Sequence, residues 1–277
     1  MSEYAFPKGV FDRGRAAFLL LTLAVTLLLA GCGTPPRTLF ARFTMEVETP
    51  EGLRTVSTVA KYSIGPNDGF LAGLSMTEVY TMFWGEAAMV DLGDRGILFC
   101  TIGGDYERAH QSLALWDFAL RLFPREGSKD QLAAHLDDLI RTHPKTTVSN
   151  AQLPLLIRFR DLADPMTAER IDPNDLEASF GSGVRIARSE FEILQTPELR
   201  WWQWFSPPPE IPITKAIQAR LPWLSLPVEA LDLKLARPKY FSLNAAKKVT
   251  DHLSAGSFIY PDSLREVREQ TPTDTDH

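Results

Sequence analysis

The sequence lacks the short motifs by which many enzyme families are identified. It has no His-Glu-x-x-His pair, no phosphate-binding loop and no dinucleotide fingerprint. Gly181-Ser182-Gly183 does not have the spacing of a Gly-x-Ser-x-Gly nucleophile elbow. His135 precedes Asp137 and Asp138, but positions two and three apart on a helix point in different directions, which favours a solvated helix face. The sequence therefore predicts no catalytic residue, no metal ligand and no cofactor.

Cysteine is scarce, with only Cys32 and Cys100 in the chain. Cys100 lies in the apolar run 97–102, where a lone cysteine is usually a small buried hydrophobe. No cationic residue stands beside it in the sequence to lower the pKa of its thiol. We therefore expect Cys100 in the core and not as a nucleophile.

The chain has fewer basic than acidic residues: it contains 29 Lys and Arg and 35 Asp and Glu, and its net charge is −6. This balance argues against a nucleic-acid partner and against electrostatic adhesion to anionic lipid. The hydrophobic fraction of 44% and the aromatic fraction of 10% are ordinary for a folded globular chain. We therefore expect most of the chain to fold.

The sequence has one long apolar run, residues 16–30, which follows Arg13 and Arg15. Its 15 residues fall short of the ~20 that a helix needs to cross a ~30 Å hydrocarbon core. The basic flank, the short run and the small residues at its end are typical of a bacterial secretory signal. An uncleaved membrane helix is the second interpretation.

The run ends at Leu29-Ala30-Gly31-Cys32, which resembles the lipobox of bacterial lipoproteins. The resemblance implies that residues 1–31 are a signal peptide, that the thiol of Cys32 is acylated and that Cys32 becomes the first residue of the mature protein. Removing the signal takes away 3 basic and 2 acidic residues and leaves 246 residues with a net charge of −7. The chain is therefore expected in the bacterial cell envelope, anchored by lipid and facing the periplasm.

The tether between Cys32 and the first predicted strand is short, residues 33–37. At ~3.3 to 3.6 Å per extended residue it reaches roughly 20 Å, which holds the folded part close to the bilayer. Gly33 stands where the enterobacterial lipoproteins retained in the inner membrane have an aspartate. The resemblance therefore implies the outer membrane more than the inner one.

Apolar and polar residues alternate strictly from residue 39 to residue 48, which indicates a half-buried strand. Thr49-Pro50-Glu51-Gly52 has turn chemistry and predicts a hairpin with the stretch that follows. A second hairpin is predicted around residues 93–96. The expected strands of this half are residues 39–48, 53–62, 78–84, 87–92 and 97–102.

The middle of the chain has helical spacing instead, with one amphipathic helix predicted over residues 106–123 and another over residues 128–141, capped by Ser128. Asp172 and Gly181 predict the two ends of a further helix, and residues 213–221 are a short helix candidate. Strands are expected at 153–159 and 184–194. This order predicts a single α+β domain over residues 38–269, with a mostly antiparallel sheet built from hairpins and two or more helices inserted mid-chain. The polar tail, residues 270–277, is expected to be disordered.

The densest charged stretch is the first candidate site, with seven charged residues: Arg158, Arg160, Asp161, Asp164, Glu169, Arg170 and Asp172. Converging arginines and carboxylates can bind an anionic ligand or transfer protons. However, Asp-Pro pairs at 164–165 and 172–173 are turn and cap signals, beside which arginines commonly tie loops down. We favour this structural role for the charged stretch.

The same stretch carries a second resemblance, to an uncharacterised family of proteobacterial proteins with no assigned activity. It rests on residues 159–165, Glu169-Arg170, residues 172–176 and 220–224, the hairpin at 47–55, and the segments from Gly85-Glu86-Ala87 to Leu98-Phe99. The resemblance covers roughly residues 40–102 and 153–224 and supplies no catalytic residue. Between residues 195 and 212 the chain departs from that pattern with an insertion of its own.

The insertion carries a dense aromatic cluster, the second candidate site: Trp201, Trp202, Trp204 and Phe205, followed by three prolines. Exposed, these rings suit a bilayer interface, a glycan or a protein partner. The alternative, which we favour slightly, is that the loop folds back and buries them.

Together the patterns predict an envelope lipoprotein whose domain is a non-enzymatic binding or structural module near the membrane. Its expected partners are the bilayer, through acylated Cys32, and an envelope protein or a glycan. A periplasmic hydrolase with an unrecognised site in residues 158–172 is the alternative. The two differ in whether those charged groups converge in a cleft or pair within loops.

Overall fold

A computed structural model describes residues 35–67, 79–108, 110–125, 131–195, 211–225, 253 and 257–259. The predicted signal peptide, Cys32, the tryptophan-rich insertion and the polar tail lie outside the described residues. The α+β class predicted from the sequence is confirmed, and the strands divide between two antiparallel sheets.

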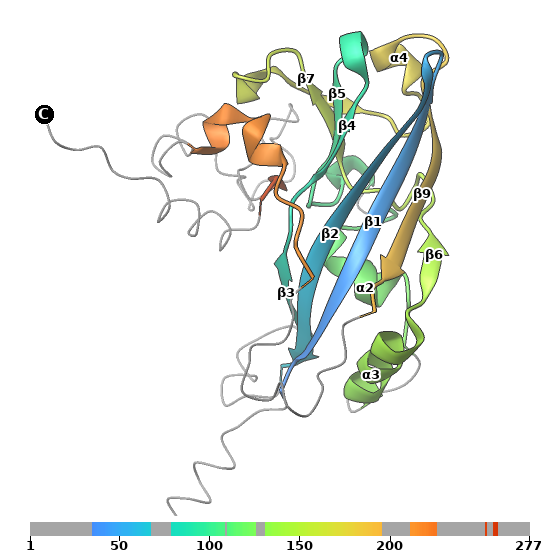
Figure 1. Ribbon diagram of the computed structural model, residues 1–277, viewed down its shortest axis with the longest axis vertical. Coiled ribbons are helices and arrows are strands. Elements are labelled where there is room, and N and C mark those ends of the chain that lie inside the picture. The colour runs from blue at the N-terminus through green and yellow to red at the C-terminus, as the bar shows by residue number, and fades with distance from the viewer. Residues whose placement is uncertain are drawn as a thin grey trace, which may run out of the picture.

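The first sheet has five strands in the order β3-β2-β1-β9-β6 (Figure 1). Their bounds are Arg37–Thr49 (β1), Gly52–Pro66 (β2), Val79–Trp84 (β3), Lys145–Thr147 (β6) and Arg185–Ile193 (β9). The predicted β1–β2 hairpin is confirmed, with pairing that runs from Arg37 and Ile64 to Thr49 and Gly52. Gly52 takes φ of 124° after the two-residue turn, a conformation that disfavours side chains.

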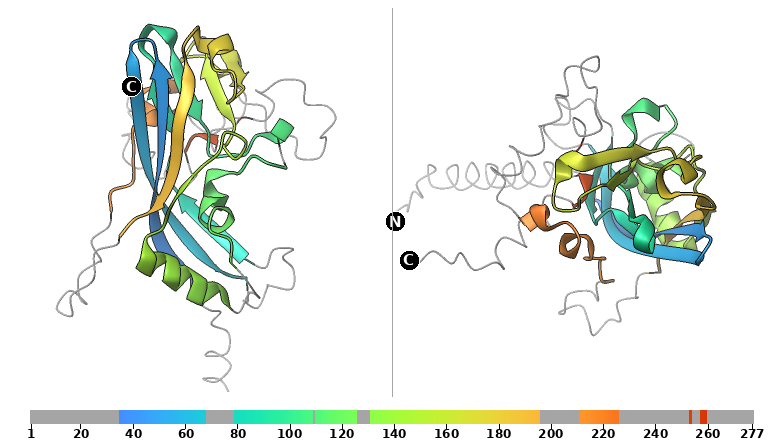
Figure 2. Two further views of the ribbon diagram at one scale, coloured as in Figure 1. Left: turned by 90° about the vertical axis from the view of Figure 1, so that its right-hand side faces the viewer. Right: turned by 90° about the horizontal axis from the view of Figure 1, so that it is seen from above.

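The second sheet has four strands in the order β4-β5-β7-β8 and lies against one face of the first (Figure 2). Their bounds are Ala88–Asp91 (β4), Ile97–Cys100 (β5), Leu156–Phe159 (β7) and Ala168–Ile171 (β8). The predicted β4–β5 hairpin is confirmed around a 3-10 turn, η2 (Gly93–Arg95). The sequence patterns did not predict β6 or β8.

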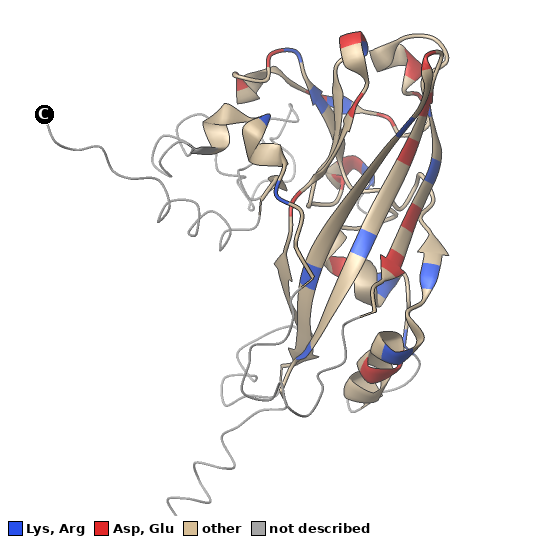
Figure 3. Cartoon of the chain, in the orientation of Figure 1, with Lys and Arg blue, Asp and Glu red and all other residues tan. Residues whose placement is uncertain are grey.

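The outer face of the five-stranded sheet carries rows of opposite charges on β1 and β9 (Figure 3). Arg42 bonds Glu192 at 3.4 Å, and Glu46 bonds Arg188 at 3.1 Å. The pair Arg185 and Glu48 continues the row. From Arg42 along β1 and from Arg188 along β9, charged or polar side chains alternate with buried ones, which keeps this part of the face in water. Nearer the start of β1, Phe40 of the same face is 6% exposed.

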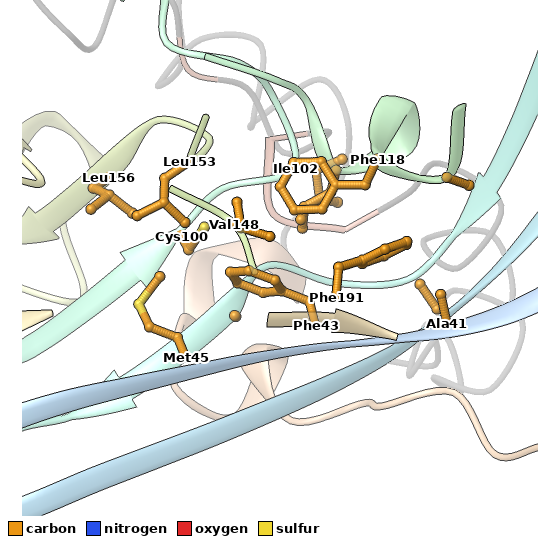
Figure 4. Packing of buried hydrophobic residues seen from close by; sticks show 14 of the residues in the cluster. Ala41, Phe43, Met45, Cys100, Ile102, Phe118, Val148, Leu153, Leu156 and Phe191 are labelled. Carbon is orange, nitrogen blue, oxygen red and sulfur yellow. The ribbon is translucent and has the colours of Figure 1, made fainter. Parts of the chain in front are cut away.

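The main hydrophobic core fills the space between the two sheets. On the inner side of β1, alternate residues from Leu39 to Val47 are at most 2% exposed. Figure 4 shows Phe43 and Met45 pointing toward residues of the opposite sheet and its connections, and Phe43 meets Phe118 edge-on at 5.7 Å between ring centroids. Cys100 belongs to this core and is 1% exposed, as predicted.

A second hydrophobic cluster covers the other face of the four-stranded sheet. Phe99 and Phe159 of the sheet pack against Trp223 and Phe258, with ring centroids 5.4 to 6.2 Å apart. The covering residues come from the C-terminal part of the chain and include the 3-10 turns η8 (Ile217–Ala219) and η9 (Pro222–Ser225). As a result, all four residues of β5 are buried, alternating between the two clusters.

The prediction of one continuous helix over residues 106–123 is wrong. The structure has instead a 3-10 turn η3 (Tyr106–Arg108), a 3-10 turn η4 (Leu115–Asp117) and a short helix α2 (Phe118–Arg121). The Ser112 hydroxyl accepts from the backbone of Asp105 and donates to the Leu153 carbonyl, and Leu113 N–H donates to Gln152 O. Tertiary hydrogen bonds to the loop before β7 therefore take backbone groups that a continuous helix needs.

Of the other predicted helices, one is confirmed and two are wrong in extent. Helix α3 (Leu132–Thr142) is confirmed, but it begins after Gln131, and Ser128 lies outside the described residues. The helix predicted from Asp172 begins only at α4 (Glu177–Phe180), because the Asp172 carboxylate accepts from Asn174 N–H in a turn. Its predicted end holds, with Gly181 at φ of 91°. In place of the helix predicted over 213–221, only the single turn η8 precedes Leu221.

The molecule has two distinct ends along its β1–β2 hairpin (Figure 1). At the Arg37 end, where β1 begins, the Arg37 guanidinium bonds Asp137 of α3 at 2.7 Å. At the opposite end, the Arg95 end, Arg95 bonds Glu51 at 2.9 Å and donates to Phe180 O at 2.9 Å. A strand of 13 residues separates these ends by about 40 Å. Among the described residues no helix is long and apolar enough to cross a membrane.

Candidate functional site

The charged stretch predicted as a candidate site lies on the β7–β8 hairpin. Arg158 and Glu169 are cross-strand partners, whereas Arg170 is the partner of Ile157. Because successive residues of a strand point to opposite faces, Glu169 and Arg170 lie on opposite sides of the sheet. The hairpin thus divides the charges into two groups that do not converge.

The first group surrounds the Glu169 carboxylate. Arg158 Nε donates to Glu169 at 2.8 Å, and Arg160 bonds the other oxygen. The hydrogen bond from Arg160 lowers the pKa of Glu169 most, although burial opposes it, and Arg158 adds to the lowering. Arg158 also donates to the Ser179 carbonyl and lies 5.7 Å from the Phe180 ring centroid, so this group ties α4 to the sheet.

The second group surrounds Asp105, whose side chain is fully buried. Arg170 Nη2 and Arg108 Nε each bond Asp105 at 2.8 Å, and Arg170 Nη1 bonds Glu107 at 2.7 Å. Burial raises the pKa of Asp105, but hydrogen bonds from Arg170 and Arg108 outweigh it, so that the pKa lies below its usual value. A carboxylate held ionised between two guanidinium groups is a poor general base.

Arg108 extends this group into the loop before β7. Its two terminal nitrogens donate to four backbone carbonyls at 2.9 to 3.3 Å, those of Asn150, Ala151, Leu153 and Pro154. A planar guanidinium with five donors can satisfy such a turn while pairing one carboxylate. The Asp105 group therefore fastens the 101–114 and 149–154 connections to β8.

The three aspartates of the charged stretch close turns. Asp161 accepts from Ala163 N–H, Asp164 from Met166 N–H and Asp172 from Asn174 N–H, each at 2.9 Å. Asp164 caps the 3-10 turn η6 (Pro165–Thr167), in which proline occupies the first turn. The predicted structural role is therefore seen in the hydrogen bonds of all three.

The sequence patterns missed two buried acidic residues, Asp105 and Glu86. The carboxylate of Glu86 accepts from the backbone N–H of Ala216 at 2.7 Å and of Ile217 at 3.0 Å, and burial raises its pKa. It thereby holds the covering segment that carries η8 onto the four-stranded sheet. Asp105 had a weak signal, because it directly follows a Gly-Gly pair and precedes Arg108 by three residues; Glu86 had none beyond lying between two apolar strands.

Cys100 and the stretch from His135 to Asp138 make their contacts within the fold. Burial raises the pKa of the Cys100 thiol above its usual range, which keeps it protonated. Asp137 and Asp138 pair with Arg37 and Arg141, and His135 bonds the Phe123 carbonyl at 2.9 Å. Within the described ranges, no group of three or more His, Cys, Asp or Glu could hold a metal ion.

A second candidate surface lies on the outer face of the five-stranded sheet, at its β3 edge. It consists of Tyr80, Met82 and Trp84 with Lys61 of β2, and we call it the β3 aromatic patch. Tyr80, Met82 and Trp84 alternate along β3 with Phe83, which is 1% exposed in the core. Tyr80, Trp84 and Lys61 are half-buried. Met82 is 39% exposed, and the Lys61 ammonium lies 5.3 Å from the Trp84 ring centroid.

The tryptophan-rich insertion has described residues on both sides. Before it, Leu194 N–H donates to the carbonyl of Phe40; after it, Thr214 N–H donates to the carbonyl of Val59. Both bonds are made to the half of the β1–β2 hairpin that includes the Arg37 end. The chain thus leaves this half of the sheet before Trp201, Trp202, Trp204 and Phe205 and returns to it afterwards.

Comparisons with known proteins found that no family model, no curated protein and no solved structure matches this chain.

Proposed function

We propose that this protein is a lipid-anchored lipoprotein of the bacterial envelope whose domain is a non-enzymatic binding or structural module at the membrane surface. One observation carries the proposal: β1 begins at Arg37, five residues after the lipobox cysteine. At ~3.3 to 3.6 Å per residue this tether spans less than about 20 Å. An acyl chain on Cys32 would hold the Arg37 end beside the head groups.

The pairing of Arg37 supports this geometry. Arg37 is bonded to Asp137 through two nitrogens, at 2.7 and 3.2 Å, so the strand is fastened to α3 at its first residue. Together with the pairing of Arg37 and Ile64 in the sheet, this partly exposed ion pair favours a strand that begins at Arg37. The domain is then a rod of about 40 Å with its Arg37 end at the bilayer and its Arg95 end in the periplasm.

The arrangement of charges favours a binding or structural module over a hydrolase. The charged groups of residues 158–172 pair within loops and between strands and lie on two faces of one sheet. A hydrolase needs such groups to meet around a nucleophile or a metal ion. The partners we propose are the bilayer, through acylated Cys32, and an envelope protein or a glycan.

The residue after the lipidated cysteine bears on the choice of membrane. Gly33 is not the aspartate that retains enterobacterial lipoproteins in the inner membrane. We therefore propose the outer membrane in preference to the inner one.

Replacement of the lipidation site tests the proposal. The full chain with Cys32→Ser is expected to lose all incorporation of labelled palmitate, because the thiol is the acylated group. Cys100→Ala is the matched control and is expected to keep the label, since Cys100 is 1% exposed in the core. Label retained in Cys32→Ser would overturn the lipoprotein assignment in favour of another anchor.

A further inference from the structure

We infer that the β3 aromatic patch, Tyr80, Met82 and Trp84 with Lys61, is the part of the folded domain that enters the head-group region of the bilayer. This inference rests on the proposed lipid anchor for its orientation. Beyond the anchor, it identifies the face of the domain that contacts the membrane.

The patch faces outward for a reason visible in the strand register. Phe83 is paired with Tyr62, and both rings lie in the core and meet edge-on at 5.1 Å between centroids. Tyr80, Met82 and Trp84 alternate with Phe83 and therefore share the opposite face. Tyr80 lies over Gly65, where any added side chain would come within 2.9 Å of the tyrosine oxygen.

The patch lies at the end of the sheet that the tether reaches. Tyr80 pairs with Gly65, next to Ile64, which pairs with the first residue of β1, Arg37. At the other side of the patch, Trp84 pairs with Lys61, which pairs with Phe40. The patch thus spans the level of the first four residues of β1, a height of about 10 Å.

The side chains of the patch have the chemistry of a membrane interface. Trp and Tyr concentrate where hydrocarbon meets head groups, because one side of the ring system is apolar and the other forms hydrogen bonds. Lys61 can lay its aliphatic stem along Trp84 and keep its ammonium in the phosphate layer. Because the chain as a whole is acidic, the rings and not the net charge provide the attraction.

The same outer face is different toward the Arg95 end. There β1 and β9 carry the ion pairs Glu46 with Arg188 and Glu48 with Arg185. Leu53 of β2, which pairs with Glu48, is 56% exposed on that face. Leu53 lies on the strand that also carries Lys61, but about 36 Å from the Arg37 end, and is therefore a matched control for the patch.

The test uses the full lipidated chain reconstituted into phosphatidylethanolamine–phosphatidylglycerol vesicles. A fluorescent NBD label is attached to Met82→Cys in one preparation and to Leu53→Cys in another, both in a Cys100→Ala background. Nitroxide-bearing lipids with a shallow probe position are then added. We expect the label at position 82 to shift to the blue and lose most of its emission, and the label at position 53 to show neither change.

Each outcome has a separate meaning. Anchored protein with equal emission loss at positions 82 and 53, or with loss only at position 53, would overturn the patch and leave the Cys32 anchor standing. Protein that does not stay with the vesicles at all would contradict the anchor itself. In the chain labelled at position 82, adding Tyr80→Ser and Trp84→Ser is expected to reduce the emission loss at least by half, and an unchanged loss would argue that the label alone enters the lipid.

Discussion

The two sheets of this molecule differ in their exposure to solvent. The five-stranded sheet packs one face on the core, and opposite charges face each other across β1 and β9 on its other face. The four-stranded sheet is covered on both faces, so that β5 is buried throughout. The charged residues near the two sheets therefore have different roles. Those on the five-stranded sheet form a solvated surface, and those beside the four-stranded sheet bind the segments that cover it.

The free energy that an ion pair contributes to folding depends on how deeply the pair is buried. An exposed ion pair contributes about 0.2 to 1 kcal/mol, because water screens it and ordering two long side chains costs entropy. Breaking a buried pair costs about 3 to 5 kcal/mol, because the remaining charge has lost its partner in a place that water does not reach. Glu46 with Arg188 represents the first kind, and Asp105 with Arg108 and Arg170 the second.

The largest effect is expected for Asp105→Ala. This change leaves Arg108 and Arg170 beside a buried site without the carboxylate that each bonds at 2.8 Å. We expect the free energy of unfolding, measured by urea denaturation of the domain, to fall by about 3 to 5 kcal/mol. A loss below about 1 kcal/mol would remove the proposed distinction between the sheets.

An intermediate effect is expected for Glu86→Ala. The change leaves the backbone N–H groups of Ala216 and Ile217 without their acceptor where the covering segment meets the sheet. Unsatisfied buried donors cost about 1 to 3 kcal/mol, and we expect a loss of that size in the free energy of unfolding. Faster proteolysis near residues 211–225 than in the unsubstituted protein would show that this segment is the part released.

Glu86→Gln is the control for this change, and it also tests how the free energy of unfolding depends on pH. Glutamine keeps an acceptor oxygen and cannot ionise, so it should retain more stability than alanine. Because burial raises the pKa of Glu86, the folded state binds the proton more tightly than the unfolded state. The original protein should therefore gain stability from Glu86 as the pH falls through the raised pKa, and Glu86→Gln should lack this gain. Identical pH profiles would contradict the assignment.

The smallest effect is expected on the outer face of the five-stranded sheet. A double-mutant cycle of Glu46→Ala and Arg188→Ala should give a coupling energy of about 0.2 to 1 kcal/mol, lower still at high salt. The two residues bond at 3.1 Å with one side chain half exposed to water. A coupling energy above about 2 kcal/mol would mean that this face is covered in the working protein.

Strands with one buried and one solvent-exposed face were predictable from the sequence, because apolar and polar residues alternate along them. This holds for β1, from Leu39 to Glu48, and for β9. Strand β8, Ala-Glu-Arg-Ile, escaped prediction because its charged residues serve ion pairs within the fold and look like loop residues in the sequence.

The candidate site was predictable in part. The turn chemistry of Asp164 and Asp172 follows from local sequence, since each bonds an N–H two residues away. The pairing of Arg170 with Asp105 joins residues 65 positions apart, and no local pattern contains it. The same cause made the 106–123 helix prediction fail, because Ser112 bonds Leu153 across 41 positions.

By itself, the sequence determined the α+β class, the two hairpins and the burial of Cys100, because each follows from side-chain period, turn residues or hydrophobicity within a short stretch. It also carries the signal and lipobox on which the proposed anchor rests, since those are local signals. Only the tertiary structure decided that the charged stretch splits between two faces of a sheet, that Asp105 and Glu86 bind distant segments, and that Tyr80, Met82 and Trp84 lie at the end where the tether joins. These facts depend on strand register and long-range packing, which bring together residues that the sequence keeps apart.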